Sequence, residues 1–153
     1  MAVYRPAMSH PTARPTQTRL LCIVYAVIAA VALAATWSQN VAYFHSPTGL
    51  LTFWSDTKVN PASRSITVDI VLFFLAAAIF MVLEGRKHAI PYVWAYLLGG
   101  ALVAISVTFP LFLIARQLRV GPSETTRLSA VDATILAVLS VLTIAFVIWV
   151  DAI

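Results

Sequence analysis

Residues 65–83 read SITVDIVLFFLAAAIFMVL, an apolar run in which Asp69 is the one charged residue. The hydrocarbon core of a bilayer is about 30 Å thick, and a helix crosses it with roughly 20 residues. The run reaches that length only when residues 65–69 are included, so Asp69 is drawn into or near the membrane. A charged side chain at that depth is costly and usually has a functional reason. Asp69 is therefore the residue whose presence most needs an explanation.

Three further segments have the same length and character, so that the predicted spans are residues 20–38, 64–84, 91–115 and 131–151. The chain is 61% hydrophobic and 10% charged, with a mean hydropathy of +0.90. In lipid each segment must satisfy its own backbone polar groups, which favours helices. The predicted fold class is an all-α integral membrane protein, a four-helix up-and-down bundle in a single domain at 19–153.

Local signals mark the ends of these spans. Residues 1–18 hold three of the eight prolines together with basic, serine and threonine residues, and predict a disordered tail. The apolar run after it is about 18 residues long, beyond the roughly 7–15 of a signal peptide, so it is interpreted as a retained span. Asn60 and Pro61 predict the start of the second span. Ser129 and Asp132 form a capping box at the start of the fourth.

Small residues predict where helices approach one another. They recur at a spacing of four in the first and third spans, as Ala26, Ala30 and Ala34, as Ala95 with Gly99, and as Gly100 with Ala104. Such ridges permit close helix contact in lipid. Pro110 lies within the third span and is expected to kink it.

Four crossings place both termini on one side of a multi-pass protein of the cell membrane. Counted on that topology, the ten Lys and Arg residues divide five against five, so the positive-inside rule does not decide the orientation. The tight Arg86-Lys87 hairpin and the basic residues before the first span favour cytoplasmic termini. Charges at helix ends reach headgroups at little cost, so substitutions of Glu84 or Lys87 are expected to change stability little.

Alternating helix directions bring most polar residues of the spans to one end of the bundle. The candidate pocket residues are Trp37, Asn40, Tyr43, Trp54, Asp56, Asp69, Thr108, Arg116 and Asp132. Carboxylates beneath aromatic side chains can hold the polar head of a hydrophobic ligand. If the protein is an enzyme, Asp69 and Asp56 are the catalytic candidates, one protonated by burial and the other ionised.

Simpler interpretations compete with this pocket. Asp132 serves as a helix cap, and Asp56 is a loop residue. Asp69 pairs with Asn40, Arg64 or Arg116 and takes no part in chemistry. In every version Asp69 is expected to face the interior of the bundle, on one stripe with Ala76, Phe80 and Lys87.

No motif indicates a metal or a cofactor. The histidines His10, His45 and His88 fall in different regions without metal-like spacing. No phosphate-cradling glycine loop occurs. The net charge of +4 is scattered and forms no nucleic-acid-binding cluster. Cys22, the single cysteine, is interpreted as a small buried hydrophobic residue.

Three segments of the chain resemble a known family. They are the pattern from Asp69 to Glu84-Gly85-Arg86, the later Pro110-Leu111-Phe112-Leu113, and the aromatic-polar segment 37–44. The family comprises bacterial membrane proteins of domain of unknown function 2834 (DUF2834), and the resemblance covers about residues 21–119. It implies a helical membrane architecture and no activity. The tail and the fourth span lie outside the family's usual extent.

Three functions are compatible with these observations. The first is a non-enzymatic accessory subunit or a binder of a lipid-like molecule, with membrane lipid, a hydrophobic small molecule, a homo-oligomer or a larger membrane complex as partner. The second is a membrane-embedded cyclase or isomerase acting on a hydrophobic substrate. The third is a transporter subunit, which needs oligomerisation to form a path.

Overall fold

The computed structural model describes residues 15–45, 48–120 and 129–151, and the regular structure in these ranges is helical. The elements are α1 (Pro15–Asn40), the 3₁₀ helix η1 (Val41–His45), α2 (Gly49–Asp56), α3 (Pro61–Lys87), α4 (Val93–Gly99), the π-helical turn η2 (Gly100–Ala104), α5 (Ile105–Arg119) and α6 (Ala130–Asp151). Four segments are long and apolar enough to cross a membrane: Gln17–His45, Pro61–Lys87, Val93–Arg119 and Ala130–Val150. The all-α membrane fold class is therefore confirmed.

The predicted helix starts are confirmed by their capping contacts. Asn60 Oδ1 accepts a hydrogen bond from the Ser63 backbone N–H at 2.8 Å, and Ser63 Oγ accepts one from the Asn60 N–H at 3.2 Å. At α6, Asp132 Oδ2 accepts from the Ser129 N–H at 3.1 Å, and Ser129 Oγ accepts from the Asp132 N–H at 3.1 Å. Each reciprocal pair satisfies backbone donors that the first helical turn leaves open. α1 begins earlier than expected, at Pro15, inside the predicted tail.

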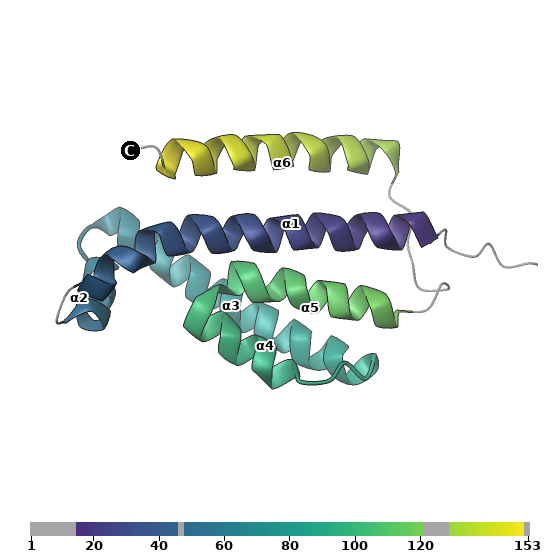
Figure 1. Ribbon diagram of the computed structural model, residues 1–153, viewed down its shortest axis with the longest axis horizontal. Coiled ribbons are helices and arrows are strands. Elements are labelled where there is room, and N and C mark those ends of the chain that lie inside the picture. Colours follow the sequence, from purple (N-terminus) through teal and green to yellow (C-terminus); the bar gives the residue numbers. More distant parts are fainter. Residues whose placement is uncertain (1–14, 46–47, 121–128, 152–153) are drawn as a thin grey trace, which may run out of the picture.

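The third apolar segment does not cross in a straight line but folds back on itself at Ala104. This residue has extended backbone angles, φ −178° and ψ 140°, between the π-helical turn η2 and α5. The rings of Tyr96 and Phe112 lie 5.8 Å apart, whereas sixteen residues of straight helix would separate them by about 24 Å. α4 with η2 and α5 therefore form an antiparallel hairpin, and the chain reverses at Ala104 (Figure 1).

Two glycines allow the arms of this hairpin to pack closely. A Cβ atom on Gly99 would lie 3.0 Å from Thr108 Cγ2. A Cβ atom on Gly100 would lie 3.0 Å from Thr108 Oγ1, 3.0 Å from the Phe74 ring and 3.2 Å from Ile105 Cδ1. These glycines were expected to mark a helix contact, and the structure places that contact between the two arms of the third segment and, at Gly100, also against α3. The sequence pattern alone did not reveal the fold-back.

We expect Gly100→Leu to destabilise the hairpin, because the added side chain meets α3 and α5 at once. Overpacking of a well-filled interior costs about 1–3 kcal/mol. The matched control is Ala101→Leu, since Ala101 is the next residue and is exposed. Thermal unfolding in detergent should show a clear loss for the first variant and little change for the second. Equal effects would contradict the tight packing at Gly100.

α5 lies at the centre of the packed body and contacts α1, α3 and α4. The α1–α5 interface is the most extensive between two helices. The buried core cluster comprises Ala77, Met81, Ile90, Leu97, Ile105 and Phe112. The Phe112 side chain fills the middle of this cluster and contacts the rings of Phe80 and Tyr96. The core therefore joins α3 to both arms of the hairpin.

α6 stands apart from this body. It runs alongside α1 in Figure 1 but makes only sparse contacts with the rest of the described chain, and nearly all of its described side chains are exposed. α1 and α6 begin at the same end of the molecule, and α6 finishes at the other (Figure 1). The start of α1 and the finish of α6 therefore lie at opposite ends of the molecule, which differs from the arrangement expected for four straight crossings. The cause of this difference is the fold-back at Ala104, which returns α5 to the end from which α4 started.

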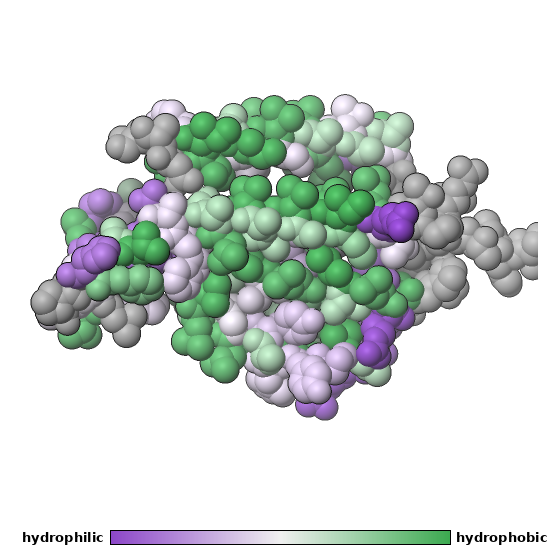
Figure 2. Space-filling view, viewed as in Figure 1, coloured by the Kyte–Doolittle hydropathy of each residue, from purple (hydrophilic) through white to green (hydrophobic). Residues whose placement is uncertain are grey.

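The surface has the character of a membrane protein. Large hydrophobic side chains are exposed along α1, α3 and α6. In Figure 2 they cover the long sides of the helices, while the most hydrophilic residues gather toward the ends. Exposed apolar area on this scale is stable only when lipid or other helices cover it.

Candidate functional site

The aromatic candidates lie together at the end of the molecule where α1 finishes and α3 begins, which we call the α2 end. Trp37, near the end of α1, contacts Phe44 with ring centroids 5.8 Å apart. Tyr43 packs edge-on against Phe53 at 5.5 Å, and Phe53 against Trp54 at 5.6 Å. The loop expected to fold at the membrane interface is thus an aromatic cluster made by η1 and α2.

Two further candidates belong to this end. The Tyr43 hydroxyl donates a hydrogen bond to Asp56 Oδ2 at 2.9 Å, so Asp56 ties η1 to α2. Asn40 is the last residue of α1. The Trp37 Nε1–H is buried and has no acceptor within the described part of the chain. The contact between Tyr43 and Asp56 holds the aromatic cluster together.

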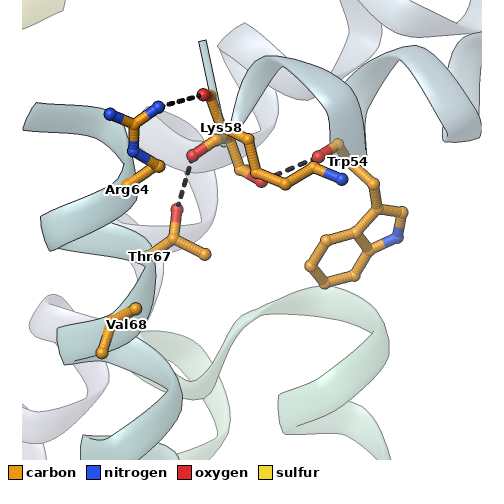
Figure 3. Close-up of a pocket in the computed structure, with 6 residues that line it drawn as sticks. Trp54, Lys58, Arg64, Thr67 and Val68 are labelled. Atoms are coloured by element: carbon orange, nitrogen blue, oxygen red, sulfur yellow. Dashed lines mark hydrogen bonds between the residues drawn. The ribbon is translucent and has the colours of Figure 1, made fainter. Parts of the chain in front are cut away.

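A groove opens beside this cluster, between the end of α2 and the first turns of α3. It has a volume of about 360 Å³ and is lined by Trp54, Thr57, Lys58, Arg64, Thr67 and Val68. Figure 3 shows the Lys58 side chain running toward Trp54, with Arg64 and Thr67 on the α3 side. The Arg64 guanidinium donates to the Lys58 carbonyl at 3.1 Å, and the Thr67 hydroxyl is 3.4 Å from the Thr57 carbonyl.

Sequence reasoning named Trp54 as a candidate but missed the two basic residues beside it. Lys58 and Arg64 were considered only in the count of basic residues that bears on membrane orientation. Arg64 was also suggested as a partner of Asp69. The available signal was a lysine and an arginine flanking the cap at Asn60, six residues apart. The turn between α2 and α3 places both of these basic residues beside the same groove.

Asp69 does not face the interior of the bundle. Its side chain is exposed on α3, and it makes no hydrogen bond or ion pair with any described residue. The buried face of α3 carries Ala77, Met81 and Gly85 instead. The expected inward stripe is wrong at Asp69 and Ala76, which are exposed, whereas Phe80 packs against Phe109 and Phe112. This helix is apolar on all sides, so its periodicity does not specify which face is buried.

Arg116, one of the suggested partners of Asp69, is engaged elsewhere. Arg116 Nε donates to Glu84 Oε2 at 2.5 Å, and His88 Nε2 lies 3.2 Å from the same oxygen. The Glu84 and Arg116 side chains are only 18% and 28% exposed. Arg119 adds a hydrogen bond to the Ala89 carbonyl at 3.0 Å. The expectation that Glu84 is a tolerant surface charge does not fit this partly buried network, which joins the ends of α3 and α5.

The remaining candidates have structural partners. Thr108 is buried against Gly99 and Gly100, and its hydroxyl is 3.5 Å from the Ala104 carbonyl. Asp132 is the capping residue of α6 described above. The candidates therefore separate into the aromatic cluster at the α2 end, the inside of the hairpin and the opposite end. No group of three or more His, Cys, Asp or Glu side chains suited to a metal ion occurs in the part of the chain that the structure describes.

Comparison with known proteins gives one result. The model of the family described as protein of unknown function DUF2834 matches residues 24–118, from α1 to the end of α5. α6 lies outside this match, as it lies outside the packed body. No curated protein and no solved structure matches the chain significantly. The matched residues are more than half of the chain and include all of the hairpin except Arg119, so the protein belongs to the DUF2834 family.

Proposed function

We propose that this protein is a non-enzymatic membrane subunit whose α3 outer face binds a transmembrane helix of another protein. The observation that carries the proposal is Asp69, exposed on a membrane-length helix without a partner in the described chain. Ionisable residues within a membrane span almost always pair with another group. The missing partner of Asp69 is a basic side chain on the neighbouring helix.

The depth of Asp69 supports this proposal. Arg64 and Glu84 are twenty residues apart on α3, about 30 Å, which matches the thickness of the hydrocarbon core. Asp69 lies five residues beyond Arg64, about 7–8 Å inside that boundary. An aspartate side chain is too short to reach the headgroups from there. An ionised aspartate facing lipid costs about 2.5–3.5 kcal/mol at the centre of a span on insertion scales, and Asp69 lies about half-way to that depth.

The residues around Asp69 suit contact with a helix. Ser65 and Ala76 lie on the same outer stripe of α3 and are exposed. Small side chains let two helix backbones approach closely in lipid. A second copy of this chain fits less well, because a symmetric α3–α3 pair sets one Asp69 against the other. Charge complementarity therefore favours a different protein.

The enzyme hypothesis has less support. It needs Asp56 and Asp69 in one site, but Asp56 on α2 accepts a hydrogen bond from Tyr43, and no contact links it to Asp69 among the described residues. A subunit function needs only the exposed face.

The fold-back also bears on orientation, and we propose that the start of α1 is cytoplasmic. Because α5 returns to the end where α3 finishes, that end carries five of the described basic residues: Arg19, Arg86, Lys87, Arg116 and Arg119. The α2 end carries two, Lys58 and Arg64. The positive-inside rule then favours a cytoplasmic basic end. The end of α6 would lie on the opposite side.

A photoreactive amino acid at Leu72 tests the docking proposal in native membranes. Leu72 lies on the Asp69 stripe and is 60% exposed, while the control, Leu98 on α4, is 61% exposed. We expect a protein adduct of one mass from position 72 and none from position 98. The adduct should persist with Asp69→Glu and disappear with Asp69→Leu, and the captured peptide should contain Lys or Arg.

Three outcomes would overturn the proposal. They are lipid adducts alone at position 72, a protein adduct that Asp69→Leu leaves unchanged, and an adduct with a second copy of this chain. Both Asp69 variants should elute as folded protein in detergent, because the exposed carboxylate makes no hydrogen bond or ion pair with any described residue.

A further inference from the structure

We infer that the groove between α2 and α3 binds one anionic phospholipid, taken from the leaflet at the α2 end. The inference concerns a different surface from the Asp69 face and does not depend on the proposed protein partner. The groove is bordered by an indole ring, two basic side chains and two threonines, and it lies where α3 enters the membrane.

The two cations of the groove are uncompensated. Neither Lys58 nor Arg64 forms an ion pair with a carboxylate in the described chain. The nearby Asp56 is bonded to Tyr43. A lipid phosphate supplies the missing negative charge, and arginine binds phosphate oxygens well because its planar guanidinium offers several donors.

The position of these residues also calls for an explanation. They are the two basic residues among those described at the α2 end, and both line the same groove. The Arg64 guanidinium donates one hydrogen bond to the Lys58 carbonyl, and its other donors have no hydrogen-bond partner among the described residues. Both side chains thus border one groove, Lys58 on the side of Trp54 and Arg64 on the side of α3 (Figure 3).

The apolar part of the groove favours a lipid over a free anion. Trp54 is 53% exposed, and Val68 continues the lining toward the hydrocarbon core. Tryptophan is enriched at membrane interfaces because one edge of its ring is apolar and the other is polar. A phospholipid occupies both parts at once, with its phosphate at the cations and an acyl chain along Trp54 and Val68.

Tryptophan quenching tests this inference in reconstituted protein. A variant with Trp37, Trp94 and Trp149 changed to Phe keeps Trp54 as the sole tryptophan. It is placed in vesicles of equal phosphatidylglycerol and phosphatidylcholine, with brominated acyl chains on one lipid or the other. Each cation near a membrane surface favours anionic lipid, so we expect roughly tenfold preferential occupancy by phosphatidylglycerol. If the triple variant fails to fold, the difference between the unmodified protein and Trp54→Phe gives the same signal.

Charge variants give the control. Lys58→Gln with Arg64→Gln should make the two lipids quench equally, whereas Arg86→Gln with Lys87→Gln, the same charge change at the opposite end, should leave the preference intact. Equal quenching in the unmodified groove would overturn the inference. So would loss of the preference in the distant pair. If inorganic phosphate abolishes the preference, the site takes free anions and the lipid assignment is wrong.

Discussion

A cysteine at Leu118 should react with a membrane-impermeant maleimide added on the same side of the membrane as the one that labels a cysteine at Arg86. A cysteine at Val59 should react only when the maleimide is added on the opposite side. Arg86 lies in the last turn of α3, Leu118 lies in the last turn of α5, and Val59 precedes α3; all three are exposed. The shared side follows from the reversal at Ala104. The experiment uses a Cys22→Ala background and intact vesicles of known orientation.

A straight third span predicts the opposite result. Val93–Arg119 is 27 residues long, about 40 Å as a continuous helix, and so Leu118 would emerge beside Val59. Labelling of Leu118 from the Val59 side would refute the hairpin. Solubilised protein serves as the control, because all three cysteines should then react.

The second large effect concerns the pair that closes the hairpin. Arg116→Leu should lower the thermal stability markedly, because Glu84 then keeps a partly buried charge without its guanidinium partner. Breaking a fully buried pair costs about 3–5 kcal/mol. Because both side chains are partly exposed, we expect about 2 kcal/mol, a fall in Tm of roughly 4–8 °C for a chain of this size. Thermal unfolding followed by size-exclusion chromatography in detergent measures it.

A variant with the two charges exchanged distinguishes the contribution of the ion pair from that of side-chain packing. Glu84→Arg together with Arg116→Glu should recover a large part of the loss, since the attraction is kept with its direction exchanged. Arg119→Gln is the matched control, because Arg119 is exposed and donates to a backbone carbonyl. Its effect should stay below about 1 kcal/mol. An Arg116 variant as stable as the parent would show that helix packing alone holds the hairpin closed.

Hydropathy was sufficient to predict the helical membrane class, because four long apolar segments have few alternatives in lipid. The caps at Asn60 and Ser129 were predictable as well, since each contact joins residues three apart in the sequence. The family resemblance extended over nearly the same residues as the family match. These features depend on composition or on neighbouring residues.

The reversal at Ala104 depends on contacts that are distant in sequence. A straight helix and a hairpin of Val93–Arg119 have the same composition. The choice rests on the fit of Gly100 against Phe74 and Thr108, and on the reach of Arg116 to Glu84. The assumption that residues 91–115 form one straight crossing placed Arg116 at the wrong end. The same error also produced the equal division of Lys and Arg residues between the two sides of the membrane.

The placement of Asp69 could not be predicted for a different reason. α3 is apolar around its whole circumference, so its sequence offers no contrast between an inner and an outer face. The only basis for predicting the orientation of Asp69 was that charged side chains avoid lipid. That rule holds for a complete assembly and need not hold for one of its chains alone. A chain that is completed by a partner can expose a carboxylate that the assembly buries.

The order of the helices along the chain has a consequence for biosynthesis. The helices that α5 packs against, α1, α3 and α4, all precede it, and so does its ion-pair partner Glu84. A growing polypeptide therefore already carries the whole docking surface when Arg119 leaves the ribosome. The hairpin can close during translation, before α6 has been made. α6 then enters the bilayer beside a finished body, as a late addition on which the earlier folding steps do not depend.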